Sequence, residues 1–243
     1  MSFSGLPERV AEIRQKIADA KARGGHGQGV RIIAVTKTHG PDAVLAAVGA
    51  GLTDVGENKV QEAIGKQDLL AALVAVPGGI LAVGRAEQPL RWHLVGHLQR
   101  NKVKFLDRFS LFQAADSSRL VDEIDALGIT RGTPVDVLLE VNVSGETSKG
   151  GYAPGGFERE AERIAGLKGI KVCGVMTMAP FDADEATLRR VFSGARAART
   201  VCERAGLPAV DLSMGMSADY EVAVEEGATM VRLGTVLFGE RTP

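Results

Sequence analysis

Short segments rich in valine, isoleucine and leucine alternate along the chain with longer segments of mixed apolar and polar residues. Eight strands are predicted in this way, at residues 30–35, 52–56, 92–96, 110–114, 134–143, 170–176, 210–213 and 230–233. The helices predicted between them include residues 59–73, 118–127, 157–167, 185–205 and 218–226. This regular alternation favours a parallel sheet, because each helix returns the chain to the edge where the next strand begins.

The number of strand-helix units distinguishes between fold classes. About eight units in 243 residues match the count and size of a (β/α)8 TIM barrel. A doubly wound open sheet uses the same alternation and is the alternative. No linker or low-complexity segment divides the sequence, so we predict a single domain over residues 1–243. The glycine-rich and proline-rich stretch at residues 76–90 is predicted to be a long surface connection.

The N-terminal 25 residues predict one helix in addition to the barrel. Leu6, Val10, Ile13 and Ile17 recur at steps of four and three among charged residues, which is the spacing of one helix face. A secretory signal would instead need a continuous apolar core after a basic start. We therefore expect an amphipathic helix here and a cytoplasmic protein.

Composition excludes several classes of function. The 29 Lys and Arg residues balance 30 Asp and Glu, so no global positive field exists to hold nucleic acid or an anionic membrane. The longest apolar run, residues 69–76, is far shorter than the roughly 18 residues of a membrane span. The two cysteines, Cys173 and Cys202, lie far apart without nearby ligands, so neither a metal site nor a disulfide framework is predicted.

Candidate ligand-binding residues follow the strands, because barrels bind ligands at the carboxyl ends of their strands. Lys37 comes two residues after the first strand, and strand alternation places it on the same face as Ile33 and Val35, pointing into the barrel mouth. There, desolvation would lower the pKa of its amine and allow a Schiff base with an aldehyde. The alternative is a lysine that extends to the solvated rim.

Two loops near the C-terminus are suited to a phosphate. Ser213, Gly215 and Ser217 lie between the seventh strand and a helix, where free N–H groups favour an anion. Gly234 and Thr235 follow the eighth strand, and strands seven and eight carry the phosphate site in many barrels. Ser217 could instead be an ordinary helix N-cap.

Three further polar residues have weaker patterns. Arg232, within the eighth strand, is a permanent cation whose alternative role is a structural salt bridge. Asn58 ends the second strand and could hydrogen-bond a ligand, although it also fits the start of a helix. His93, inside the third strand, and His97, just after it, are predicted to be structural rather than catalytic.

Six sequence motifs resemble the pyridoxal-phosphate homeostasis proteins, which are single-domain relatives of the alanine-racemase-type barrel. They are AVTKT at residues 34–38, GENKVQE at 56–62, WHLVG at 92–96, LQRNK at 98–102, and the segments 142–150 and 212–239. They run in family order over nearly the whole chain. The chain departs from the family pattern at Thr36, where serine is usual, at His97, where proline is usual, and in a longer connection at residues 69–90.

The resemblance implies a barrel that binds pyridoxal 5'-phosphate (PLP) as a Schiff base on Lys37. It also implies phosphate contacts from residues 213–217, Gly234 and Thr235, with Arg232 facing the pyridine nitrogen. Family members are described as carriers or regulators of vitamin B6 and amino-acid pools without an established reaction. We expect PLP as the ligand, PLP-dependent apo-enzymes as candidate recipients, and a monomer.

Two other functions remain open from the sequence. A PLP-dependent amino-acid racemase would use the same site, but it needs a base on each face of its substrate. The racemases that the chain resembles supply a tyrosine from a second domain, and neither Tyr152 nor Tyr220 has a pattern that marks it as a base. The other alternative is a barrel for a different phosphate, with Lys37 as a counter-charge.

Overall fold

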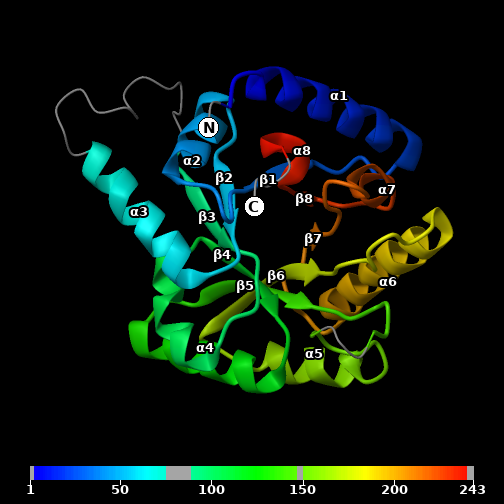
Figure 1. Cartoon of the computed structure of the whole chain (residues 1–243). Helices are drawn as coiled ribbons and strands as arrows, with labels where there is room; N and C mark the ends of the chain where they lie inside the picture. The colour runs from blue at the N-terminus through cyan, green and yellow to red at the C-terminus, as the bar shows by residue number, and fades with distance from the viewer. Residues whose placement is uncertain (1–2, 75–88, 147–149, 240–243) are drawn as a thin grey trace.

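Eight parallel strands close into a barrel in a computed structural model that describes residues 3–74, 89–146 and 150–239. Each strand pairs with its neighbour in sequence, and the last strand pairs with the first. Figure 1 shows this ring with the helices outside it. The strands are β1 Arg31–Val35, β2 Asp54–Glu57, β3 Arg91–Leu94, β4 Leu111–Ala115, β5 Val135–Glu140, β6 Ile170–Met176, β7 Asp211–Ser213 and β8 Met230–Leu233. The barrel is confirmed and the open sheet is excluded.

Helical segments connect the strands around the outside of the ring. They are α1 Leu6–Gly24, α2 Pro41–Gly49, α3 Val60–Val74, the 3-10 helix η2 Arg100–Arg108, α4 Ser118–Arg131, α5 Phe157–Ala165, α6 Glu185–Arg204, α7 Tyr220–Glu225 and α8 Thr235–Phe238. Proline lies in the first turn of α1 and of α2, where its missing N–H costs no helical hydrogen bond. The predicted N-terminal helix is thus confirmed, beginning at Leu6.

Most strand residues are buried on either face of the sheet because both faces are covered. Ile33 and Ala34, neighbours on β1, are each fully buried although they point to opposite sides of the sheet. Leu138 and Leu139 on β5 show the same pattern. Outward-facing residues pack under the helices and inward-facing residues fill the barrel, which explains the continuous apolar runs in the sequence.

Two element boundaries differ from the sequence prediction. The fifth strand ends at Glu140 rather than at residue 143, because the Asn142 side chain accepts a hydrogen bond from the Gly145 N–H (3.0 Å) and turns the chain. A 3-10 helix, which the periodicity does not predict, occupies residues 100–108 and places Lys102 within 3.0 Å of Gln61 Oε1. The predicted connection at residues 76–90 falls largely outside the described residues.

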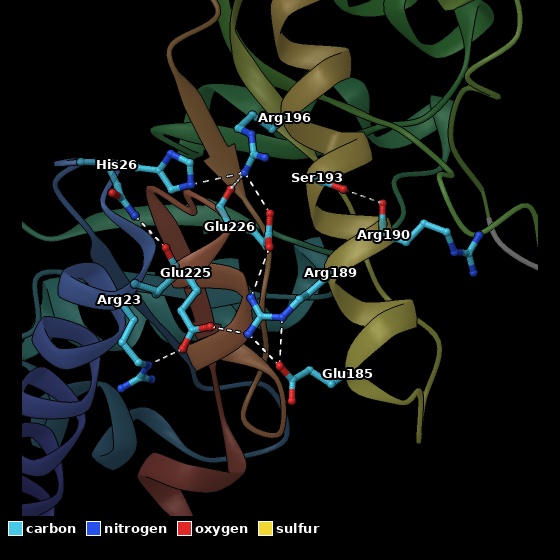
Figure 2. Close-up of polar contacts among 11 residues, drawn as sticks. Arg23, His26, Glu185, Arg189, Arg190, Ser193, Arg196, Glu225 and Glu226 are labelled. Atoms are coloured by element: carbon cyan, nitrogen blue, oxygen red, sulfur yellow. Dashed lines mark hydrogen bonds and ion pairs between the residues drawn. The ribbon is translucent and has the colours of Figure 1, made fainter.

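A cluster of ion pairs joins α1, α6 and α7 (Figure 2). Glu225, at the end of α7, accepts hydrogen bonds from Arg23 of α1 (2.5 Å) and Arg189 of α6 (2.5 Å). The next residue, Glu226, pairs with Arg189 (3.3 Å) and Arg196 (3.0 Å). Because α1 also packs against α7 and α8, the N-terminal helix is fastened to the last two units of the barrel.

Two observations concern the membrane and cysteine predictions. Across the ranges that the structure describes, every helix is too short or too polar to span a lipid bilayer. Cys173 and Cys202 are both free thiols. Burial raises the pKa of the Cys173 thiol to about 11 and that of Cys202 to about 12, so both stay protonated at neutral pH.

Candidate functional site

The candidate site lies at the barrel mouth, the end of the ring where the strands finish. Lys37, which is half-buried, follows β1 by two residues. Strand β8 is hydrogen-bonded beside β1, with Ile33 paired to Arg232. A Cβ atom on Gly234 would lie 3.5 Å from the Val35 carbonyl oxygen. Lys37 and the segment after β8 therefore leave neighbouring strands at the same end of the barrel.

The loop after β7 meets the segment after β8 through one serine. The Ser217 Oγ accepts hydrogen bonds from the N–H groups of Gly234 (3.4 Å) and Val236 (3.2 Å). Its own hydroxyl hydrogen can then be donated outward, as an anion would require. The structure thus brings together Ser217, Gly234 and the exposed Thr235, which begins α8.

The alternative role of Ser217 as a helix N-cap does not agree with the structure. Helix α7 begins at Tyr220, and Asp219 occupies the N-cap position. The Asp219 carboxylate accepts a hydrogen bond from the Met216 N–H (2.5 Å), so it helps to shape the loop. The predicted helix start at residue 218 is two residues too early, because Ser217 and Asp219 are both common N-cap residues and local sequence does not choose between them.

Gly215 allows this loop to pack closely against α7. Its φ of +91° lies in the region that favours glycine. A Cβ atom there would lie 2.6 Å from the Ala223 Cβ and 2.9 Å from the Tyr220 Cα. The Gly215 carbonyl also accepts a hydrogen bond from the Arg232 N–H (2.9 Å), which ties the loop to β8.

The Arg232 guanidinium is buried at the centre of the barrel, with the residue 6% exposed. Nη1 donates to the Ser213 carbonyl (2.8 Å) and Oγ (2.7 Å), and Nη2 donates to the Thr177 carbonyl (2.9 Å). Burial lowers the pKa of Arg232 to about 10, so the group is still a cation at neutral pH. A structural salt bridge is not what holds it, because these acceptors are neutral oxygens.

A chain of buried side chains continues from Ser213 across the barrel. The Ser213 Oγ donates to Gln113 Oε1 (2.7 Å), Gln113 Nε2 lies 3.0 Å from His93 Nδ1, and His93 Nε2 lies 2.9 Å from Asp54 Oδ1. The prediction that His93 is a satisfied structural group is confirmed. Burial alone would raise the pKa of Asp54, but hydrogen bonds from His93 and Arg91 outweigh it and hold that pKa below its ordinary value.

Other polar residues lie around the same rim. Asn58 is half-buried after β2, and Gly96 approaches it so closely that a Cβ on Gly96 would lie 2.5 Å from the Asn58 carbonyl oxygen. His97 is exposed, and its Nδ1 lies 2.8 Å from Asp116 Oδ2. Glu140 ends β5 and is 7% exposed. Burial, followed by the nearby Asp116 charge, raises the pKa of Glu140.

A second buried cluster, formed by Thr36, Glu57, Glu62 and Lys66, escaped the sequence analysis. Lys66 Nζ donates to Glu57 Oε1 (2.6 Å) and Glu62 Oε1 (2.9 Å). The spacing of Glu62 and Lys66 is a recognisable helical ion pair. Their contact with the end of β2 has no local signal, because it depends on how α3 packs against the barrel.

The described part of the chain contains no candidate metal site. Within residues 3–74, 89–146 and 150–239, no group of three or more His, Cys, Asp or Glu side chains is arranged to hold a metal ion. The polar groups of the mouth include the Lys37 amine, the buried Arg232 guanidinium and the Ser217 hydroxyl, with Asn58, His97 and Glu140 around the rim.

This combination of a closed barrel, a lysine after β1 and an arginine on β8 is that of an alanine-racemase-type barrel. The family model described as alanine racemase, N-terminal domain, matches residues 9–242. The pyridoxal phosphate homeostasis protein of Aquifex aeolicus is 38% identical over 96% of this chain and 97% of its own length. The chain belongs to the family of pyridoxal phosphate homeostasis proteins.

Solved structures agree with this assignment. PipY of Synechococcus elongatus, solved with PLP bound, is 32% identical, has a TM-score of 0.80, and is matched over 96% of this chain and 100% of PipY. Alanine racemase of Corynebacterium glutamicum has a TM-score of 0.67 at 16% identity, over 94% of this chain and 61% of the racemase. At that identity the racemase likeness concerns the fold alone.

Proposed function

We propose that this protein binds PLP and takes part in PLP homeostasis without catalysing a reaction of its own. The observation that carries the proposal is the placement of a half-buried lysine, Lys37, beside the strand that supplies Arg232 and Gly234. Its relative PipY, similar over its whole length, has been solved with PLP bound. PLP supplies an aldehyde that captures amines and a ring that withdraws electrons.

The residues of the mouth fit the three chemical parts of PLP. We assign the amine of Lys37 to the aldehyde carbon. The phosphate is assigned to the loop shaped by Gly215 and to Ser217, Gly234 and Thr235, where the Ser217 hydroxyl and the exposed Thr235 offer neutral hydrogen-bond donors. No carboxylate among these residues would repel an anion.

The remaining predicted residues serve the ring. Arg232 is assigned to the pyridine nitrogen, and Asn58 to the ring edge beside β2. Ser213 was predicted to contact the phosphate, but its hydroxyl bonds Arg232 and Gln113 inside the barrel. We therefore infer that Ser213 holds Arg232 in position.

The absence of a reaction is inferred from acid-base chemistry. Arginine stays protonated at neutral pH, so Arg232 can only donate to the pyridine nitrogen and leaves the ring a weak electron sink. Burial raises the pKa of Tyr220 to about 12 and that of Tyr152 further still, which makes both tyrosines poor proton acceptors at neutral pH. A racemase tolerates a weak electron sink but needs a base on each face of its substrate, so it is the state of the two tyrosines that supports a carrier over a racemase.

The binding proposal is tested by reducing the PLP-loaded protein with borohydride, followed by intact-mass measurement and peptide mapping. One PLP group is expected on Lys37, none on Lys37→Ala, and an unchanged yield on the control Lys168→Ala, which removes an exposed lysine from the opposite end of the barrel. A colourless wild type that takes up no added PLP would contradict the proposal. Uptake of a phosphate without a trapped lysine would favour the counter-charge alternative.

Catalysis and transfer need separate measurements. Loaded protein incubated with single L-amino acids in deuterated water is expected to show no exchange at the α carbon. Turnover in this assay would instead establish a racemase-type enzyme. The recipients that we propose are PLP-dependent apo-enzymes. A purified apo-enzyme should then regain activity faster from the loaded protein than from an equal concentration of free PLP.

A further inference from the structure

Lys66 on α3 lies outside the barrel wall with three acceptors around its ammonium. The residue is 5% exposed, and its Nζ donates to the Thr36 carbonyl (2.8 Å), Glu57 Oε1 (2.6 Å) and Glu62 Oε1 (2.9 Å). An ammonium has three hydrogens, so all of its donors are used. Lys66 is therefore bound in place, and its ammonium has no hydrogen left for another partner.

These contacts reach the backbone on both sides of Lys37. The Thr36 carbonyl, which Lys66 binds, belongs to the peptide group that precedes Lys37. The Thr38 N–H, in the peptide group that follows, donates to Glu62 Oε1 (2.6 Å). The Thr36 hydroxyl adds a hydrogen bond to Glu57 Oε1 (2.5 Å). Both backbone torsions of Lys37 are thus restrained from α3 and β2.

The turn at residues 36–39 has a backbone conformation that its own residues do not favour. Thr38 has a φ of +70°, a left-handed conformation that is uncommon for a β-branched residue. Such a conformation persists only where the surroundings impose it. Two interactions can impose it here, the hydrogen bond from the His39 N–H to the Thr36 carbonyl (3.1 Å), which closes the turn, and the hydrogen bond from the Thr38 N–H to Glu62, which ties the turn to α3.

A contribution to protein stability does not by itself explain why Lys66 and Glu57 form a buried ion pair. Apolar side chains of similar size often stabilise a protein as well as a buried pair does. Glu57 is fully buried, and its Oε2 has no hydrogen-bond partner among the described residues, so part of its desolvation is uncompensated. The cluster is better suited to fixing a geometry than to adding free energy.

We propose that Glu57, Glu62 and Lys66 are positioning residues that hold the backbone of Lys37 so that its amine faces the barrel mouth. The inference rests on the proposed function, because it assigns these three residues to PLP capture by Lys37. Thr36 and Glu57 face α3, whereas strand alternation directs Lys37 to the opposite side of the sheet. The cluster therefore acts through the backbone and does not touch the ligand.

Two variants separate positioning from folding. Glu62→Ala removes the contact with Thr38 and leaves the pair between Lys66 and Glu57 intact. The double variant Glu57→Gln/Lys66→Met removes the pair without leaving an unpaired charge in the interior. Glu62→Gln retains an acceptor oxygen and serves as the conservative rescue. Lys168→Met is the matched control for loss of a lysine charge.

The first readout needs no cofactor. Lysines of the PLP-free protein are methylated with formaldehyde and cyanoborohydride, and the rate at Lys37 is compared with that at exposed lysines by peptide mapping. Release of the turn is expected to raise the rate at Lys37 at least threefold in Glu62→Ala and in the double variant. Rates at the exposed lysines should not change, whereas a general loss of folding would also raise the rates at other buried lysines.

The second readout is the rate at which PLP becomes trapped on Lys37 by borohydride. It is expected to fall at least tenfold in Glu62→Ala and in the double variant, and to return to within threefold of wild type in Glu62→Gln. If both Lys37 rates stay within twofold of wild type in folded Glu62→Ala, the positioning role is wrong. If wild type traps no PLP, the proposed function fails, and the methylation comparison still decides whether Lys37 is positioned.

Discussion

Glu140 shows at the residue scale how burial at the barrel mouth sets a charge. Burial and Asp116 raise the pKa of its carboxyl above the unfolded value, against the attraction of Arg232. The free energy of unfolding therefore falls as the pH rises toward the pKa of Glu140 in the folded protein. Below about pH 4 the carboxyl is protonated in both the folded and the unfolded chain, and this loss is absent. We expect Glu140→Gln to be more stable than wild type at pH 7.

Urea unfolding at pH 4.5 and pH 7 measures this difference. The advantage of Glu140→Gln is expected to be smaller at pH 4.5. The exposed Glu158 provides the control, and Glu158→Gln should leave stability unchanged at both pH values. An equal effect of Glu140→Gln at the two pH values would show that its carboxyl ionises as in the unfolded chain.

Gly215 permits a second prediction at the residue scale. An alanine there must adopt a φ of +91° and also approach Ala223 and Tyr220. Gly132→Ala is the matched control, because Gly132 has a φ of +71° and a Cβ there would meet no atom within 4 Å. We expect Gly132→Ala to cost about 1 kcal/mol and Gly215→Ala clearly more in urea unfolding. Equal losses would show that the loop has room for a side chain.

Local patterns predicted some residues of the site and could not predict others. Lys37, Ser217 and Gly234 lie one to four residues after strands, where sequence order alone places them at the mouth. The hydrogen bond between Ser213 and Gln113 joins residues 100 positions apart, so neither residue carries a local sign of it. Local sequence does not determine which way Ser213 faces, since a hydroxyl near a loop can face either the mouth or the interior.

At the scale of elements, α1 is held to the barrel by the contact between its last turn and the end of α7. A Cβ on Gly24 would collide with the backbone of Glu225, which also accepts the hydrogen bond from Arg23 (Figure 2). We expect Gly24→Ala to separate the two helices and to lower the free energy of unfolding by about 1 to 3 kcal/mol.

Gly65 in the middle of α3 is the control for this substitution. A Cβ there meets no atom within 4 Å, so Gly65→Ala is expected to stabilise the protein by up to about 1 kcal/mol through helix propensity. Both variants are compared by urea unfolding and by protease cleavage within α1. No change in cleavage or stability in Gly24→Ala would mean that α1 adjusts freely against α7.

Element type was predicted better than element boundaries, and the reason is physical. Strands such as β1 and β5 have consecutive apolar residues buried on both faces, which produces apolar runs that survive in the sequence. Ends depend on single contacts, such as the Asn142 side chain that stops β5. The 3-10 helix at residues 100–108 has three charged residues in its first five, and it buries only Val103 and Leu106, a pair too short to mark a helix by itself.

At the scale of the whole molecule, the prediction of one domain and one subunit can be tested together. Trp92, the single tryptophan, lies on β3 and is 9% exposed, so its fluorescence reports on the barrel. One domain requires that fluorescence and far-UV circular dichroism change at the same urea concentration. Two separate unfolding transitions would instead indicate two domains. Sedimentation is expected to give a species of 25.6 kDa, and a doubled mass would indicate a dimer.

The pairing of β1 with β8 has a consequence for synthesis in the cell. The lysine that we assign to the aldehyde stands at position 37, whereas Ser217 and Gly234 are made almost 200 residues later. A nascent chain on the ribosome thus carries the amine long before the partners that would retain a phosphorylated ligand. Stable loading must wait until translation is nearly complete, so the cofactor cannot template the early stages of folding.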